Sequence, residues 1–172
     1  MKVFVSILLL LSNLIATGGS ISKEAQMKSD TVRNKETIKK LFEEYINNDE
    51  TNSLDKIFSD DYIGPNGEKG PEGFAGVINS LKKGFPDIQY RVEDLIGENE
   101  TVAVHWVWNG THEGVFRGFE PTHKKVRNDG FAFFKFKGDK VVSSAFMTDR
   151  LGFHQAIGVL PKIIAPPPKN SN

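Results

Sequence analysis

The chain has 172 residues, of which 38% are hydrophobic and 26% charged, and this composition fits one globular domain with a sizeable core. The 22 Lys and Arg residues balance the 22 Asp and Glu residues, so no net charge favours nucleic acid or a membrane surface as a partner. The sequence contains no cysteine, so disulfides do not contribute to its stability.

The N-terminus has the composition of a secretory signal peptide. Lys2 precedes an apolar run that extends to about Ile15, and several small residues follow. The run is shorter than the roughly 20 apolar residues that a membrane span requires. We therefore expect residues 1–19 to be a signal peptide, cleaved between Gly18 and Ser22, and the mature protein to be soluble and secreted.

Two sequences fit the N-glycosylation motif of a secreted protein. They are Asn99-Glu100-Thr101 and Asn109-Gly110-Thr111. Asn99 lies in a polar turn and is the better acceptor, whereas Asn109 ends an expected strand, where a glycan is harder to accommodate. We expect a glycoprotein with these two candidate sites.

Helical patterns dominate the first half of the chain after a polar stretch at 20–33, which is expected to be a flexible lead-in. Apolar residues within 38–46 recur at the spacing of one helical stripe. A short second helix has its apolar stripe at Leu54, Ile57 and Phe58. The third helix begins at Gly70-Pro71, where proline fits the first turn, and ends before Pro86.

From residue 88 the hydrophobic period changes from 3.6 residues to 2, which is typical of strands. The strands expected from this pattern cover residues 88–96, 102–109, 131–136 and 141–147. A short helix follows Asp149, and residues 161–172 form a Pro-rich tail that is expected to be disordered. Helices followed by an antiparallel meander predict an α+β fold, with a curved sheet shaped as a cone whose mouth can hold a small molecule.

Several motifs of this layout occur together in one known family. They are Glu72-Gly73-Phe74, Phe85-Pro86-Asp87, Gly110-Thr111-His112 with Gly114, Phe116 and Gly118 before Pro121-Thr122, and Asp149-Arg150-Leu151-Gly152-Phe153-His154-Gln155. Together they resemble the SnoaL-like polyketide or ester cyclase family of the nuclear transport factor 2-like superfamily. The resemblance covers residues 34–160 and implies the cone-shaped α+β fold, with N-terminal helices packed on a curved antiparallel sheet.

The resemblance also implies a chemistry, in which a polyketide ring closes by an intramolecular aldol reaction without a metal or cofactor. It implies a carboxylate in the last strand, a histidine in the preceding long strand and a polar residue after the second helix. By spacing within this sequence these positions fall on Phe146, Ala132 and Gly64, whose side chains cannot transfer a proton. The family's fold is therefore expected and its cyclase chemistry is not.

His105 and Asp149 are the remaining candidates for catalytic residues, as a relocated acid–base pair. Asp149 precedes the last helix, where a general acid and a helix N-cap are alternative interpretations. His105 lies in the middle of a strand. It is interpreted either as a base that faces a cavity or as a core or surface histidine whose hydrogen bond is satisfied. His112 is interpreted as fixing its connection, and Asn128-Asp129 as turn residues.

Aromatic residues are expected to line an apolar pocket. They are Tyr62, Phe74, Trp106, Trp108, Phe116, Phe131, Phe133 and Phe146. An ordinary core position is the alternative for each, and strand alternation prevents His105 and both tryptophans from facing one cavity.

Two functions fit these observations. The first is a secreted binder of a small, flat, hydrophobic molecule, because an aromatic cavity without catalytic groups suits such a ligand. The second is a cofactor-independent cyclase- or isomerase-like enzyme that uses the His105/Asp149 pair. A homodimer through the sheet face is a further expectation for a fold of this kind.

Overall fold

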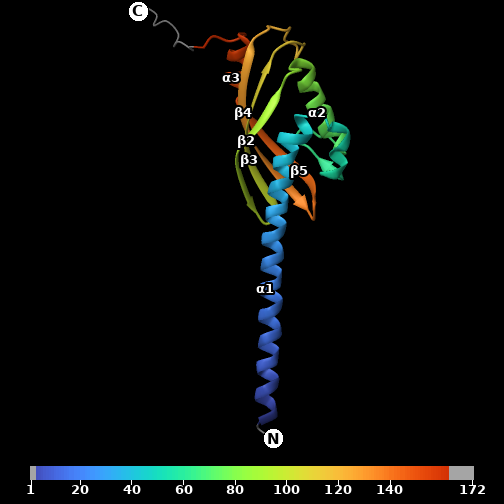
Figure 1. Ribbon diagram of the computed structural model, residues 1–172, viewed down its shortest axis with the longest axis vertical. Helices are drawn as coiled ribbons and strands as arrows, with labels where there is room; N and C mark the ends of the chain where they lie inside the picture. Colours follow the sequence, from blue (N-terminus) through green and yellow to red (C-terminus); the bar gives the residue numbers. More distant parts are fainter. Residues whose placement is uncertain (1–2, 163–172) are drawn as a thin grey trace, which may run out of the picture.

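The computed structural model describes residues 3–162, with side chains from residue 21 onward. Its elements are α1 (Val3–Lys40), the π-helix η1 (Leu41–Ile46), the 3-10 helix η2 (Thr51–Lys56), β1 (Phe58–Ile63), α2 (Gly70–Gly84), β2 (Gln89–Glu98), β3 (Thr101–Thr111), β4 (Lys125–Lys137), β5 (Lys140–Thr148) and α3 (Arg150–Ile157). Five strands form one curved sheet in the order β1-β5-β4-β3-β2, with helices packed on it (Figure 1). The predicted α+β class is confirmed. The predicted tail lies outside the described residues from position 163 onward.

The long helix α1 projects well beyond the sheet (Figure 1). It includes residues 20–33, for which the sequence predicts a flexible lead-in. Its exposed turns carry helix-spaced ion pairs, such as Lys28 with Glu24 at 2.9 Å, which add modest stability. Nearer the sheet, Arg33 donates a hydrogen bond of 3.1 Å to the carbonyl of Gly138. The helix is therefore anchored on the sheet at one end.

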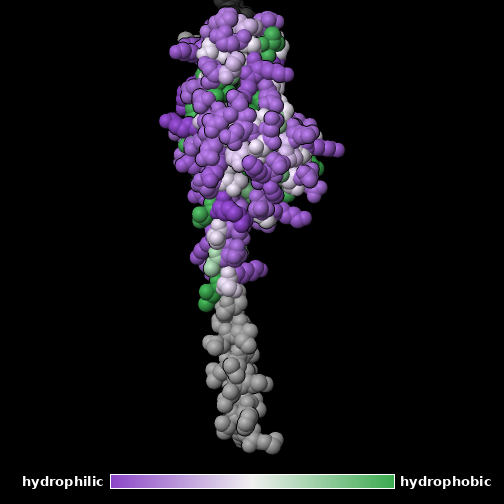
Figure 2. All heavy atoms as spheres, turned by 45° about the vertical axis from the view of Figure 1, so that its right-hand side comes forward, coloured by the Kyte–Doolittle hydropathy of each residue, from purple (hydrophilic) through white to green (hydrophobic). Residues whose placement is uncertain are grey.

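The view of the molecule in Figure 2 shows a globular part covered mainly by hydrophilic residues, from which α1 projects. Exposed apolar side chains on this projecting helix are Ile21, Met27 and Val32. None of the helices within residues 3–162 is long and apolar enough to span a membrane.

The strand β1 is the main departure from the expected layout. Phe58, which the sequence pattern assigns to the second helix, instead begins β1 and lies opposite Val141 in a parallel pairing with β5. The polar segment 59–61 obscures this strand, because β1 lies at the sheet edge and buries only Phe58 and Tyr62. The sheet is thus mixed and not purely antiparallel as expected.

Strand β4 separates the two faces of the sheet. Its even-numbered residues from 126 to 136 are buried, and most of its odd-numbered residues are exposed. The strand begins at Lys125, so Asn128 and Asp129 are strand residues and not turn residues as interpreted. Phe131 and Phe133 are 54% and 55% exposed on the outer face, in contrast to their expected position in the pocket.

The outer face of the sheet carries exposed apolar side chains. Met147 and Ile96 are 75% and 70% exposed, and they share this face with Phe131 and Phe133. Exposed apolar patches of this kind are typical of interaction surfaces. The homodimer through the sheet face stays a prediction.

Both asparagines of the glycosylation motifs are exposed. Asn99 lies in the turn between β2 and β3 with a left-handed φ of 52°. Asn109 lies within β3, paired with Gln89 and Arg127. Their glycosylation stays a prediction.

Candidate functional site

A cavity of about 580 Å³ lies between the inner face of the sheet and the helices. Its size is in the range of small-molecule sites. Six of the eight expected pocket residues line it, and Phe131 and Phe133 do not. The six are Tyr62, Phe74, Trp106, Trp108, Phe116 and Phe146.

Stacked and edge-on aromatic rings form the cavity walls. Phe42 of η1 stacks on Trp106 of β3, with ring centroids 6.2 Å apart. On the opposite side, Phe74 of α2 packs against Phe146 of β5 at 6.2 Å. Phe134 packs edge-on beneath Phe146 at 5.5 Å. These contacts fix flat apolar surfaces on several sides of the cavity.

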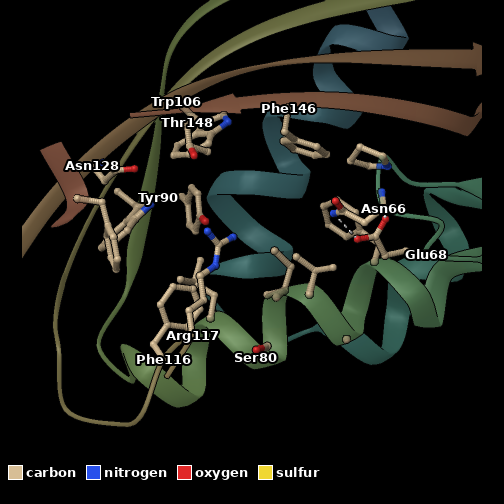
Figure 3. A pocket seen from close by; sticks show the side chains of 18 of the residues that line it. Asn66, Glu68, Ser80, Tyr90, Trp106, Phe116, Arg117, Asn128, Phe146 and Thr148 are labelled. Carbon is tan, nitrogen blue, oxygen red and sulfur yellow. Dashed lines mark hydrogen bonds between the residues drawn. The ribbon is translucent and has the colours of Figure 1, made fainter. Parts of the chain in front are cut away.

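Two polar groups interrupt the aromatic wall formed by β2 and β3. The indole nitrogen of Trp106 is buried and has no hydrogen-bond partner within the described residues. Its ring lies against Gly130, where a Cβ would come within 2.4 Å of it. The hydroxyl of Tyr90 points into the cavity (Figure 3), and burial raises the pKa of this phenol, so it stays protonated at neutral pH. The Tyr90 hydroxyl can donate a hydrogen bond to a ligand, whereas the Trp106 nitrogen is enclosed by protein atoms.

Asn128 contributes an amide to the same part of the cavity. Its side-chain nitrogen donates a hydrogen bond of 2.7 Å to the carbonyl of Asp149. This bond leaves the side-chain oxygen free to turn toward the cavity (Figure 3). Asn128 is only 5% exposed, so its orientation is fixed by the surrounding strands.

Glu68 supplies a carboxylate at another part of the cavity wall. It accepts hydrogen bonds from the backbone nitrogen and the side-chain nitrogen of Asn66, at 2.9 and 2.8 Å. Burial opposes ionisation of this carboxyl, but the hydrogen bonds from Asn66 outweigh burial and hold its pKa below the usual value. A Cβ at Gly64 would lie 2.3 Å from Glu68 Oε2, so the carboxylate fills the space beside the glycine.

Tyr62 is directed into the same region from β1. Its hydroxyl lies 2.7 Å from the hydroxyl of Ser144. Burial raises the pKa of Tyr62, with the Ser144 hydrogen bond acting in the opposite direction. This phenol is therefore neutral at physiological pH, and the hydrogen bond fixes β1 to β5.

A two-residue turn places Arg117 at the cavity. Phe116 and Phe119 exchange two backbone hydrogen bonds of 3.0 Å, and the residues between them, Arg117 and Gly118, have φ angles of 51° and 82°. Left-handed values at both central positions are the signature of a type I′ turn. The guanidinium carbon lies 5.2 Å from the centre of the Phe116 ring, and Figure 3 shows the guanidinium pointing into the cavity.

His112 fixes the connection that carries this turn, as interpreted from the sequence. It is fully buried and stacks on Phe85 at 5.0 Å, and its Nδ1 lies 3.2 Å from the hydroxyl of Thr122. Burial lowers its pKa, so the ring is neutral. Nearby, a Cβ at Gly114 would come within 2.0 Å of the Lys83 carbonyl oxygen, so only glycine fits there.

The structure does not bring His105 and Asp149 together at the cavity. Asp149 caps α3, where its Oδ1 accepts a hydrogen bond of 2.8 Å from the backbone nitrogen of Gly152. His105 lies between Asp94 and Asp129, at 3.4 and 3.6 Å, in the outer layer of side chains with Phe131. Neither residue lines the cavity, in contrast to the acid–base hypothesis. Within the described residues, no group of three or more His, Cys, Asp or Glu side chains is placed to hold a metal ion.

The positions implied for cyclase chemistry lie in or near this cavity. Phe146 lines it, and Ala132 is buried directly opposite Phe146 in the β4–β5 pairing. Sequence reasoning missed Glu68, Tyr90 and Arg117 as cavity residues. Tyr90 could have been found from its alternation with exposed neighbours, because it pairs with Trp108 on the inner face.

Comparison with known proteins gives one family and many similar folds. The model of the SnoaL-like polyketide cyclase family matches residues 36–157. The candidate SnoaL-like polyketide cyclase of Jannaschia sp. CCS1 is 23% identical, with 77% of this chain and 96% of that chain covered and a TM-score of 0.68. The candidate polyketide cyclase of Acidithiobacillus ferrooxidans is 24% identical, with 73% and 94% covered and a TM-score of 0.65. TsrD of Streptomyces laurentii is 19% identical, with 77% and 97% covered and a TM-score of 0.68. No curated protein matches the chain.

Proposed function

This chain belongs to the SnoaL-like polyketide cyclase family, and from this premise we propose that it is an exported protein that binds a small, flat, hydrophobic molecule without closing a ring. One observation carries the proposal. The cavity has aromatic walls, and the three positions implied for proton transfer hold Phe146, Ala132 and Gly64.

Ring closure by an aldol reaction requires removal of a proton beside a carbonyl, which needs a base at the reacting carbon. Glu68 is the carboxylate on the cavity wall, but its hydrogen bonds to Asn66 lower its pKa and make it a weaker base. His105 and Asp149 are both engaged elsewhere. The geometry therefore supports binding better than acid–base catalysis.

Apolar burial is sufficient to hold such a ligand. A flat molecule of two or three rings and the cavity walls that cover it bury about 400 Å² of apolar surface together, and removal of that surface from water gains roughly 10 kcal/mol. Packing between aromatic rings such as Trp106 and Phe42 adds to this gain, and loss of ligand freedom opposes it. We expect affinities in the micromolar range for a ligand of this size.

Titration with the uncharged fluorescent probe N-phenyl-1-naphthylamine tests the proposal. The probe is expected to bind with a Kd of about 1–10 μM and to quench tryptophan fluorescence, because Trp106 and Trp108 line the cavity. Asp149→Asn and His105→Gln serve as controls and should leave this Kd within about twofold. Absence of probe binding by the folded protein would contradict the proposal, as would a cyclase turnover that either control variant abolishes.

The proposed export is supported by Lys2 and by the apolar run that extends to about Ile15. Expression in secreting cells is expected to release a protein whose first residue lies between Gly19 and Ser22. N-terminal sequencing of protein from the medium measures this. Retention of an intact Met1 inside the cells would contradict export.

A further inference from the structure

We propose that the molecule bound in the cavity is a flat, conjugated acid, and that Arg117 binds its anionic group at the cavity mouth. This inference rests on the proposed function, since it assigns a chemical class to the ligand of that same cavity. It starts from the one turn in the cavity wall that holds a charged residue in a left-handed conformation.

The conformation of Arg117 determines where its charge lies. Its φ of 51° is typical of glycine or asparagine, and an arginine adopts it at an energetic cost. The reciprocal hydrogen bonds between Phe116 and Phe119 hold the turn closed. In this conformation the side chain crosses the Phe116 ring and its guanidinium points into the cavity (Figure 3).

The guanidinium of Arg117 has N–H donors that can bind a ligand. No carboxylate of the described residues forms an ion pair with it, and its contact with the Phe116 ring uses one face of the group. Arginine presents several N–H donors in a planar fork that matches a carboxylate or sulfonate in bidentate geometry. Arg117 is exposed at the mouth of the cavity, so an anionic group of the ligand can reach its guanidinium.

The remaining charges of the cavity orient the ligand. Arg150, at the start of α3, is a second cation on the lining. Glu68, on the segment before α2, is the carboxylate on the lining, and its lowered pKa keeps it ionised. An anionic group is therefore attracted toward Arg117 and Arg150 and repelled by Glu68. A ligand with one charged end has a single favoured direction in the cavity.

A donor deeper in the cavity specifies a second feature of the ligand. This donor is the hydroxyl of Tyr90, which points into the cavity (Figure 3) and which burial keeps protonated. A carbonyl or phenolic oxygen on the ligand would accept a hydrogen bond there, so we assign a conjugated acid that also carries such an oxygen.

Two probes that differ in one sulfonate group test the charge preference. They are 8-anilino-1-naphthalenesulfonate, which is an anion, and the uncharged N-phenyl-1-naphthylamine. At low ionic strength the anion is expected to bind at least about tenfold more tightly, and this preference should decrease with added salt because screening weakens the pair. Arg117→Gln is expected to weaken anion binding by about tenfold and to change binding of the uncharged probe by less than twofold.

The controls separate charge at the mouth from charge elsewhere. Arg117→Lys should retain part of the preference, and Arg127→Gln, on the exposed side of β4, should retain all of it. Equal binding of both probes by the wild-type protein would overturn the inference but leave the proposed function intact. Equal weakening of both probes by Arg117→Gln would also overturn it, because Arg117 would then shape the mouth and not bind the anion. If neither probe binds, the proposed function fails as well.

Discussion

Replacing Phe134 by alanine is expected to lower the free energy of unfolding by about 3–5 kcal/mol. Phe134 is fully buried on the inner face of β4. Its ring packs edge-on against Phe42 at 6.1 Å and against Phe146 at 5.5 Å. The variant leaves an empty space between the sheet and η1 that backbone-anchored neighbours cannot fill. Urea unfolding followed by circular dichroism measures the loss.

The adjacent phenylalanine provides a matched control. Phe133 has the same side chain on the same strand, but it points to the outer face and is 55% exposed. Phe133→Ala is therefore expected to cost less than about 1 kcal/mol. An equal loss of stability in the two variants would contradict the assignment of faces on β4.

Phe146→Asp is expected to weaken binding of N-phenyl-1-naphthylamine by more than about tenfold. The substitution places a carboxylate in the aromatic wall beside Phe74 and Phe134. A charge there retains water in the cavity, and displacing that water opposes binding of an apolar molecule. Fluorescence titration gives the Kd, and thermal unfolding of the same sample shows whether the variant is folded.

Phe146→Leu is the control, because it keeps the wall apolar and is expected to change the Kd by less than about threefold. Comparison of the two variants separates the effect of a charge on the Kd from the effect of losing the phenyl ring. Unchanged probe binding by a folded Phe146→Asp protein would show that the probe does not occupy the cavity beside β5.

The α+β layout could be predicted because its signals are local. The apolar stripe within 38–46 and the proline at the start of α2 correspond to elements of the structure. The faces of the strands could not be assigned in the same way. Alternation assigns the residues of a strand to two faces, but it does not say which face is buried. The pairing of Ala132 with Phe146 places Phe146 on the cavity side of the sheet. Phe131 lies opposite Met147 on the outer face.

The candidate site depends on features with weak local signals. β1 buries only two of its residues, so its sequence lacks the regular alternation that identifies a strand. Arg117 reaches the cavity because of a left-handed turn that a non-glycine residue rarely forms. By contrast, the N-cap interpretation of Asp149 is confirmed, because it rests on one local hydrogen bond to Gly152.

The pairing of β1 with β5 has a consequence for synthesis of the protein on the ribosome. Phe58 pairs with Val141, so β1 emerges long before its partner strand does. Phe146 and Thr148, which line the cavity, lie on this partner strand β5, and Phe153 lies on α3, which is made later still. Contacts between distant segments form slowly because the intervening chain must first be ordered. The helices that precede β2 and the strands β2–β4 can therefore assemble during translation, whereas the ligand site is completed only after α3 has left the ribosome.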